Sequence, residues 1–235
     1  MATFNATDIL NIQQLPNGRA GVWFLNWRIE AKPINQIVGA THEDFAGAGL
    51  YGICFDDHLI YIGSFLGNKP KSVNFSGDVV TSRWWTHIGA ITVRGHRVHI
   101  ARASLRALQE SFPSNHPLIG GFLGAQSFEI LHKGNGNLSP LRRLNFAAMH
   151  SHDFLNRNVI PSHVLSRFEF VYVRYKKLPS TLNAQALKVH IESAEIKLIK
   201  ELAPPCNSTH IPKGKEPVVV NLSDVEGHLR RALDE

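Results

Sequence analysis

The run GLYGICFDDHLIYIG, residues 49–63, decides the fold that we predict for this chain. It holds two stretches rich in β-branched and aromatic residues, 49–55 and 59–63, separated by the polar residues Asp56, Asp57 and His58. Two such stretches joined by a short polar turn are typical of a β-hairpin. Tyr51 and Tyr61 then lie on neighbouring strands, where paired tyrosines usually serve packing.

The rest of the chain alternates strand-like and helix-like patterns around this hairpin. Asp78 is a suitable N-cap for a helix predicted over residues 79–88. Further along we predict strands over 97–100 and 168–175, and helices over 104–111, 140–156, 183–202 and 223–233. Before the hairpin, only residues 21–27 resemble a strand. The predicted fold class is α+β, with a small and mostly antiparallel sheet flanked by helices.

Composition narrows the class of protein. A hydrophobic fraction of 43% is enough to build a core, and a net charge of +6 is compatible with a polyanionic partner. No stretch approaches the roughly 20 apolar residues of a membrane helix, and no secretion signal opens the chain. Cys54 and Cys206 form no CxxC pair. We therefore expect a protein of the bacterial-type cytoplasm, with both thiols as small apolar fillers and no membrane partner.

One carboxylate of the predicted helix 183–202 falls within its apolar stripe. Ile191, Glu195, Leu198, Ile199 and Leu202 share one face at helical spacing. A buried charge needs a partner, and a divalent cation or an arginine would supply it. The alternative is that Glu195 lies at the edge of the stripe and pairs with a lysine or arginine.

Arg83 and His87 are one helical turn apart on the predicted helix 79–88. They project from the same face, where two adjacent cationic groups suit an anion. The alternative is an ordinary solvated helix face.

Taken together in sequence order, these residues resemble a known family. The pattern is Gly49-Leu50-Tyr51, then Tyr61-Ile62-Gly63, then Arg83-x-x-x-His87, then Glu195, then Pro204-Pro205-x-Asn207. In this it is similar to the GIY-YIG nucleases, although it has Leu50 where that motif has isoleucine. The resemblance implies a three-stranded GIY-YIG-like core formed by residues 49–93 and 168–207.

The resemblance also implies roles for the first four motif side chains. Tyr51 acts near the attacking water, as its general base, and Tyr61 shapes the surrounding hydrogen bonds. Because a free phenol has a pKa near 10, base catalysis at neutral pH requires a nearby cation. Arg83 contacts the scissile phosphate and His87 relays or accepts a proton.

The remaining two motif residues complete the implied site. Glu195 holds one Mg²⁺ or Mn²⁺ per active site, because hard cations prefer oxygen ligands. Asn207, the last catalytic motif residue, fixes local geometry.

Basic residues concentrate between the two halves of the predicted core. Residues 94–177 contain 12 Lys and Arg against 4 Asp and Glu, a segment charge of +8. This favours phosphate contacts by the long, mainly helical insertion over residues 94–167, although a solvated helical surface is the alternative. The predicted DNA-binding residues are Lys69, Lys71, Arg94, Arg97, Arg102, Arg142, Arg143 and Arg157.

The resulting hypothesis is a sequence-specific endonuclease that cuts double-stranded DNA as a restriction enzyme does. Residues 1–48 form an accessory layer and residues 208–235 a tail with a short helix. One active site per chain suggests a homodimer on a palindromic site. Two alternatives are a structure-specific repair or recombination nuclease and a non-catalytic nucleic-acid-binding protein on the same scaffold.

Two close groups of histidines allow a different metal interpretation. His96 with His99, and His150 with His152 and Asp153, contain common zinc ligands. In a chain with 13 histidines such pairs arise by chance, so zinc is the weaker alternative.

Overall fold

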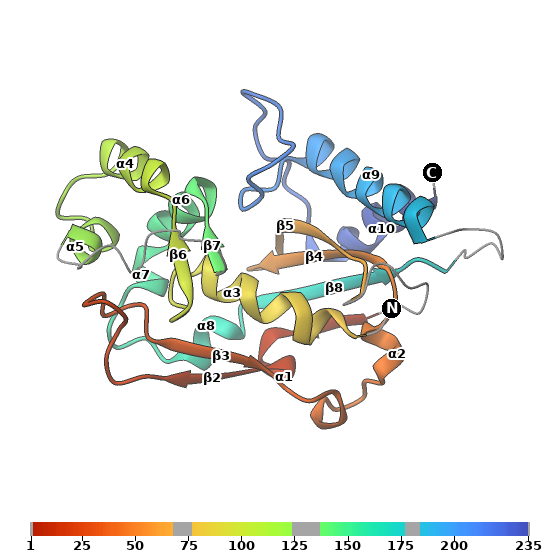
Figure 1. The fold of residues 1–235 in the computed structure, drawn as a ribbon, viewed down its shortest axis with the longest axis horizontal. Coiled ribbons are helices and arrows are strands. Elements are labelled where there is room, and N and C mark those ends of the chain that lie inside the picture. The colour runs from red at the N-terminus through yellow and green to blue at the C-terminus, as the bar shows by residue number, and fades with distance from the viewer. Residues whose placement is uncertain (1, 68–76, 124–136, 177–183, 235) are drawn as a thin grey trace. The chain divides into compact units, whose positions relative to one another are not determined.

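A computed structural model of the protein describes residues 2–67, 77–123, 137–176 and 184–234 (Figure 1). The chain divides into two compact units. Unit 1 comprises Met1–Leu10, Ala31–Trp84 and Leu165–Glu235, and unit 2 comprises Asn11–Glu30 and Trp85–Val164. The units differ from the predicted division, because the C-terminal tail belongs to unit 1 and part of the N-terminal layer belongs to unit 2.

Unit 1 is built on an antiparallel sheet, and helices pack against it, as expected for the α+β class. In their order across the sheet, the strands are β1 (Ala2–Asn5), β8 (Phe168–Arg174), β4 (Gly49–Phe55) and β5 (His58–Phe65). Figure 1 shows β4 and β8 side by side in the middle of this unit. The predicted hairpin and the predicted strand after residue 167 are thus confirmed.

The prediction of three strands was wrong, because the N-terminus supplies a fourth. β1 pairs with the outer edge of β8, from Ala2 opposite Tyr172 to Asn5 opposite Glu169. Its four residues alternate apolar and polar side chains, but a run of this length is at the lower limit for recognising a strand from the sequence. The ring of Phe4 lies 4.5 Å from that of Phe45, so the strand also adds to the core.

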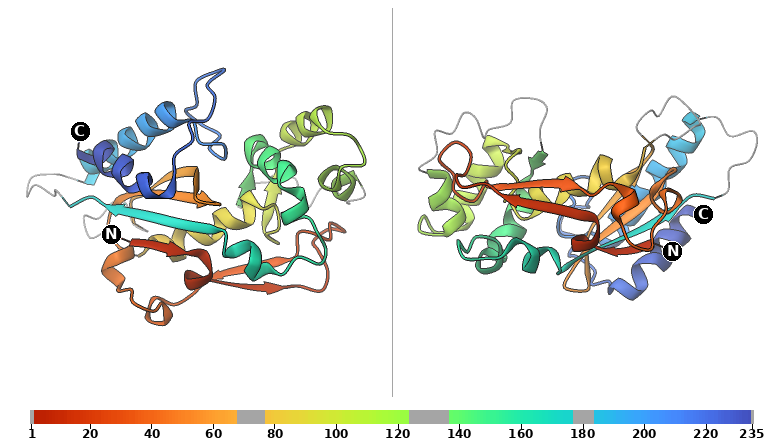
Figure 2. Two further views of the ribbon diagram at one scale, coloured as in Figure 1. Left: turned by 180° about the vertical axis from the view of Figure 1, so that it is seen from behind. Right: turned by 90° about the horizontal axis from the view of Figure 1, so that it is seen from below.

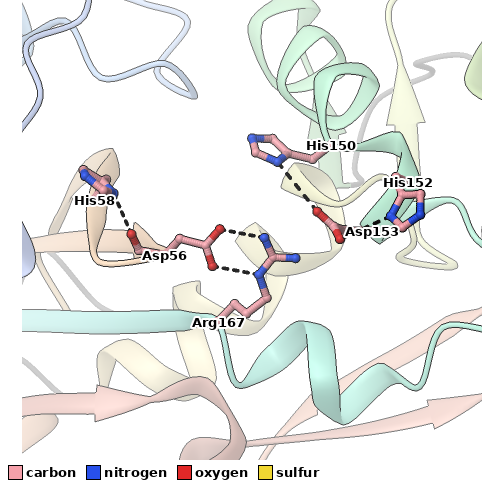
Figure 3. Close-up of polar contacts among 6 residues, drawn as sticks. All are labelled: Asp56, His58, His150, His152, Asp153 and Arg167. Atoms are coloured by element: carbon pink, nitrogen blue, oxygen red, sulfur yellow. Dashed lines mark hydrogen bonds and ion pairs between the residues drawn. The ribbon is translucent and has the colours of Figure 1, made fainter.

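The hairpin turn has the backbone geometry that its sequence allows. Asp56 and Asp57 both have positive φ, 49° and 62°, as a two-residue type I′ turn requires. Arg167, just before β8, donates two hydrogen bonds of 2.7 and 2.6 Å to the Asp56 carboxylate (Figure 3). This pair ties the turn to the start of the neighbouring strand.

Two helices cover one face of the sheet. They are α9 (Ala184–Leu202) and α10 (Leu222–Asp234), and the left view of Figure 2 shows them together on one side of β4 and β5. Buried side chains of both helices pack against Leu50, Cys54 and Ile62 of the strands. The predicted helices over 183–202 and 223–233 are confirmed.

The opposite face of the sheet carries an aromatic cluster centred on Trp84. The indole stacks on Phe170, with ring centroids 4.5 Å apart and planes inclined by 17°. Tyr51 and Phe45 meet it edge-on, at 6.3 and 6.0 Å. Trp84 is fully buried, so it anchors the segment that carries Arg83.

The helix predicted after Asp78 begins with π-helical geometry. Asp78 Oδ1 accepts a hydrogen bond of 2.7 Å from the Thr81 amide, which is the expected cap. The π-helix η2 (Val80–Trp84) is followed directly by α3 (Trp85–Ile91). Single π-helical turns within helices are frequent at functional sites. The division between the two units falls between these elements.

The outer edge of β5 is covered by irregular chain rather than by another strand. The Leu59 amide donates to the Val220 carbonyl at 2.9 Å, and the Cys206 amide donates to the Ile60 carbonyl at 2.9 Å. Covering an edge strand in this way prevents it from pairing with other chains.

The other short elements of unit 1 are α1 (Ala6–Ile9), η1 (Ile34–Gln36) and α2 (His42–Phe45).

Unit 2 is mainly helical and contains two small sheets. Beyond α3, its helices are α4 (Arg102–Ser111), α5 (Pro117–Leu123), α6 (Leu141–Met149), α7 (Ser151–Phe154) and α8 (Pro161–Leu165), the last ending at the unit boundary. Its strands are β2 (Leu10–Gln14) with β3 (Trp27–Ala31), and β6 (Val98–Ile100) in parallel with β7 (Asn137–Ser139). The predicted helix over 140–156 is divided at His150.

The strand predicted over residues 21–27 is absent from the structure. Val22 forms an isolated bridge with Arg19, turns follow, and β3 begins only at Trp27. Val22 and Phe24 to Trp27 are buried, so the run shows no alternation between inside and outside. Its apolar side chains pack as an irregular core segment of unit 2.

Among the residues that the structure describes, no helix has both the length and the apolar character needed to cross a membrane.

Candidate active site

Four successive residues of β5, Tyr61 to Ser64, form the centre of the candidate site in unit 1. Each is approached by a motif residue from another part of the chain. Tyr61 lies near Tyr51, Ile62 is bonded to Asn207, Gly63 lies beneath the Tyr51 ring, and Ser64 is bonded to Glu195. Segments up to 156 positions apart in the sequence, from Tyr51 to Asn207, thus meet on one edge strand.

The phenol of Tyr51 explains the glycine of the second motif. Tyr51 and Gly63 are direct partners across β4 and β5. A Cβ at position 63 would lie 2.4 Å from both Cζ and the phenolic oxygen of Tyr51. The ring of Tyr61 is 6.1 Å away, and Tyr61 is half-buried whereas Tyr51 is only 2% exposed. Tyr61 is therefore the more accessible of the two phenols.

Arg83 stands on η2 beside the aromatic cluster. Its side chain is exposed, while the adjacent Trp84 is buried against Tyr51. Burial raises the pKa of Glu195, and the charge of Arg83 is the smallest of the effects that oppose this rise, so the guanidinium acts electrostatically on the carboxylate. The aromatic cluster thus fixes the backbone from which this cation extends.

Glu195 projects from the middle of α9 towards β5. The predicted apolar stripe is confirmed, since Ile191, Leu198 and Ile199 are buried and Glu195 is partly buried among them. Its Oε2 accepts a hydrogen bond of 2.5 Å from the Ser64 hydroxyl.

Burial raises the pKa of Glu195, and three neighbouring groups oppose that shift. In order of size these are the Ser64 hydrogen bond, the charge of His210 and the charge of Arg83, while the charge of Glu192 adds to the increase. The carboxyl group is thus partly desolvated, while the Ser64 hydrogen bond and the neighbouring cations favour its charged form, which is the form that binds a metal ion.

Asn207 acts on the backbone of β5. Its Nδ2 donates to the Ile62 carbonyl at 2.8 Å, and its Oδ1 accepts from the Ile62 amide at 2.9 Å. The side chain is 2% exposed and replaces the partner strand that β5 lacks at this point. It holds the strand at the residue between Tyr61 and Gly63.

His87 belongs to unit 2. Its Nδ1 lies 3.3 Å from an Nη atom of Arg143, which donates to it. The proton-relay role of His87 stays a prediction from the resemblance.

The predicted DNA-binding residues differ in their exposure. Lys69 and Lys71 lie outside the described residues. Arg97, Arg102 and Arg157 are exposed, and Arg142 and Arg143 are partly exposed. Arg97 and Arg157 lie over indole rings, of Trp85 at 5.9 Å and of Trp23 at 5.1 Å. These five arginines can reach a ligand on the surface of unit 2.

The prediction that Arg94 binds DNA was wrong, because its side chain is 0% exposed. The guanidinium donates to the Phe154 carbonyl at 2.6 Å and to Asn26 Oδ1 at 2.8 Å. It also lies 4.4 Å from the ring centroid of Trp27, and burial lowers its pKa to about 10. Arg94 is a core residue that joins three segments of unit 2.

The histidine pairs give no support to the zinc alternative. Figure 3 shows His150 and His152 on either side of Asp153, with Nδ1 to Oδ distances of 4.0 and 3.8 Å. His96 Nδ1 lies 3.2 Å from the Trp27 carbonyl. Within the described part of the chain, no three His, Cys, Asp or Glu side chains are grouped to hold a metal.

The residues around Glu195 nevertheless fit a hard cation such as Mg²⁺. This ion keeps several waters and binds proteins through one or two carboxylates together with substrate phosphates. It does not require a cluster of protein ligands. Because Ser64 occupies Oε2, Oε1 of Glu195 is the oxygen that would face such an ion.

Two residues of the site, Ser64 and His210, were missed in the sequence. Ser64 directly follows the Tyr61-Ile62-Gly63 motif, and alternation along β5 assigns it to the face opposite Gly63. That signal was available. His210 lies in irregular chain with a positive φ of 65°, where no periodic pattern operates.

Comparison of the chain with models of protein families, with curated proteins and with solved structures finds no match.

Proposed function

We propose that the chain is a metal-dependent endonuclease of the GIY-YIG type that cuts double-stranded DNA at specific sequences, as a restriction enzyme does. One observation carries the proposal. The motif residues from β4, α9 and the segment after α9 all contact the run Tyr61 to Ser64. Residues that merely matched a pattern by chance would have no reason to share one short stretch of strand.

Hydrolysis of a phosphodiester needs an activated water and stabilisation of the charge that builds up on the phosphate. Arg83 supplies an exposed, permanently charged donor for that phosphate. Tyr51 and Tyr61 supply two neighbouring phenol groups, and under this proposal one of them positions or deprotonates the water. Asn207 and Trp84 keep these groups in place, the first through Ile62 and the second through Tyr51.

Glu195 is the residue that would hold the cation. A bound Mg²⁺ supplies positive charge for the phosphate and the leaving oxygen. The Glu195 side chain contributes the anionic oxygen, and its partial burial restricts the number of waters that compete for that position.

DNA is proposed to contact the exposed arginines of unit 2. Arg97, Arg102 and Arg157 carry charge at the surface, and phosphate contacts from such residues provide affinity without sequence preference. A homodimer on a palindromic site is proposed because two equivalent active sites cut the two strands of a duplex.

The test is digestion of a sequenced plasmid with Mg²⁺, followed by sequencing of the fragment ends. The wild-type protein should yield discrete fragments that share one terminal sequence. Glu195→Gln keeps the size of the side chain and removes its charge, so cleavage should fall by at least about 10³-fold, or about 4 kcal/mol in barrier. Binding to the same duplex in chelator should persist.

Glu201→Gln is the matched control, because Glu201 is an exposed carboxylate on the same helix. It should cut like the wild type. Near-normal cutting by Glu195→Gln at ordinary Mg²⁺ would contradict the assignment of Glu195. Cleavage of branched or damaged DNA alone would indicate a repair nuclease, and binding without any cleavage would indicate a non-catalytic protein.

A further inference from the structure

The hydrogen bond between Ser64 and Glu195 lies on the face of β5 that α9 and α10 cover. Ser64 is opposite Leu50, and Leu50 belongs to the core packed under α9 and α10. Its neighbour Gly63 is opposite Tyr51, whose ring lies on the other face. Two adjacent residues of one strand therefore contact the phenol and the carboxylate of the site.

We propose that Ser64 is a positioning residue that orients the Glu195 carboxylate for a cation. This inference rests on the proposed function. The Ser64 hydroxyl donates to Oε2 at 2.5 Å and thereby fixes the rotation of the carboxylate. Oε1 then keeps its lone pairs for the ion. The contact is part-buried, so water competes for the Oε2 position less than it would at the surface.

A carboxylate on a long side chain gains from such a restraint. Glu195 extends from a helix through three rotatable bonds, and ordering them costs free energy when a ligand binds. Hydrogen-bond partners of ligating carboxylates orient them in advance, and loss of one typically weakens metal affinity by about 10- to 100-fold.

The position of Ser64 also sets the distance between the two parts of the site. Consecutive residues of a strand have their Cα atoms about 3.8 Å apart. Gly63 lies directly beneath Tyr51, and the next residue, Ser64, holds Glu195, so the distance between the phenol and the carboxylate is set by two adjacent residues of β5. If α9 shifted along β5, the hydrogen bond to Ser64 would break and this distance would change.

The experiment compares Ser64→Ala with Ser64→Thr, which keeps the hydroxyl and suits a strand. Mn²⁺ is titrated into the DNA-free protein, and the free ion is followed by electron paramagnetic resonance. Ser64→Ala should raise the Mn²⁺ dissociation constant by about 10- to 100-fold, and Ser64→Thr should restore most of the affinity. Thermal unfolding in chelator should remain close to wild type for both variants.

Glu195→Gln, measured in the same titration, separates this inference from the proposed function. If Glu195→Gln loses Mn²⁺ binding while Ser64→Ala binds as tightly as wild type, the positioning role is refuted and the metal site stands. If Glu195→Gln binds Mn²⁺ normally, the metal site itself is refuted. A weaker Ser64→Ala that Ser64→Thr fails to restore would also overturn the role of the hydroxyl.

Discussion

Replacement of Gly63 by alanine tests the placement of the Tyr51 phenol directly. The added Cβ would lie 2.4 Å from Cζ and from the phenolic oxygen, whereas ordinary van der Waals contact begins at 3.4 Å. The ring must therefore move by about 1 Å, the difference between these distances. Tyr51 is 2% exposed and packed near Tyr61 and Trp84, so it cannot simply swing into solvent.

The expected cost follows from this overpacking. Inserting one methyl group into a closely packed core typically destabilises a protein by about 1–3 kcal/mol. A shift of about 1 Å in a catalytic group can lower a rate by about 10²-fold. Gly63→Ala should therefore lose stability in urea unfolding and, under the proposed function, lose single-turnover cleavage more than stability alone would explain.

A double-mutant cycle with Tyr51→Ala distinguishes this explanation from a backbone effect. Once the Tyr51 ring is removed, Gly63→Ala should cost little, so the two free energies of unfolding should be strongly non-additive. Gly227→Ala on α10 is the control, since its Cβ would meet nothing within 4 Å, and it should stabilise by about 0.5–1 kcal/mol. Additive effects of the Gly63 and Tyr51 changes would refute the proposed overlap between the Cβ and the ring.

Three further predictions concern unit 2 and the core of unit 1. Arg94→Met should lower the free energy of unfolding by about 2–4 kcal/mol, measured in urea, because buried hydrogen-bond acceptors lose their donor; a neutral result would contradict its structural role. Arg142→Ala and Arg143→Ala should each reduce the log–log salt slope of DNA binding by about 1 if they contact phosphate, and an unchanged slope would exclude that contact. Burial raises the pKa of the Cys54 thiol to about 12 from its ordinary value of 9.0. The thiol ionises at lower pH in the unfolded chain than in the folded one. As the pH rises between these two values, the free energy of unfolding of the wild type should therefore fall relative to that of Cys54→Ala, by at most about 1.4 kcal/mol per pH unit. An equal pH dependence of the two proteins would refute the shift.

The sequence alone determined the elements whose signal is local. The hairpin follows from two β-rich stretches around a turn, and Asp56 and Asp57 tolerate the positive φ that this turn needs. Asp78 caps its helix through groups three residues away. The apolar stripe around Glu195 follows from helical periodicity.

Tertiary structure decided which of the polar residues have buried partners. Arg94 looks like any other arginine of a basic segment, and only the arrangement of Asn26, Trp27 and Phe154 around it makes it a core residue. Formal charge carries no information on exposure, so the sequence could not distinguish it from Arg97. The same is true of the fourth strand, because β1 is recognisable only by the free edge of β8 that it covers.

The candidate site combines both kinds of information. Its residues were visible in the sequence as isolated motifs, yet the contacts of Ser64 with Glu195 and of Asn207 with Ile62 span 131 and 145 positions. Local periodicity assigns each side chain to a face of its own element and says nothing about which faces meet. That meeting is fixed by the packing of α9 on the sheet and by the edge position of β5, where the chain after α9 bonds to its backbone.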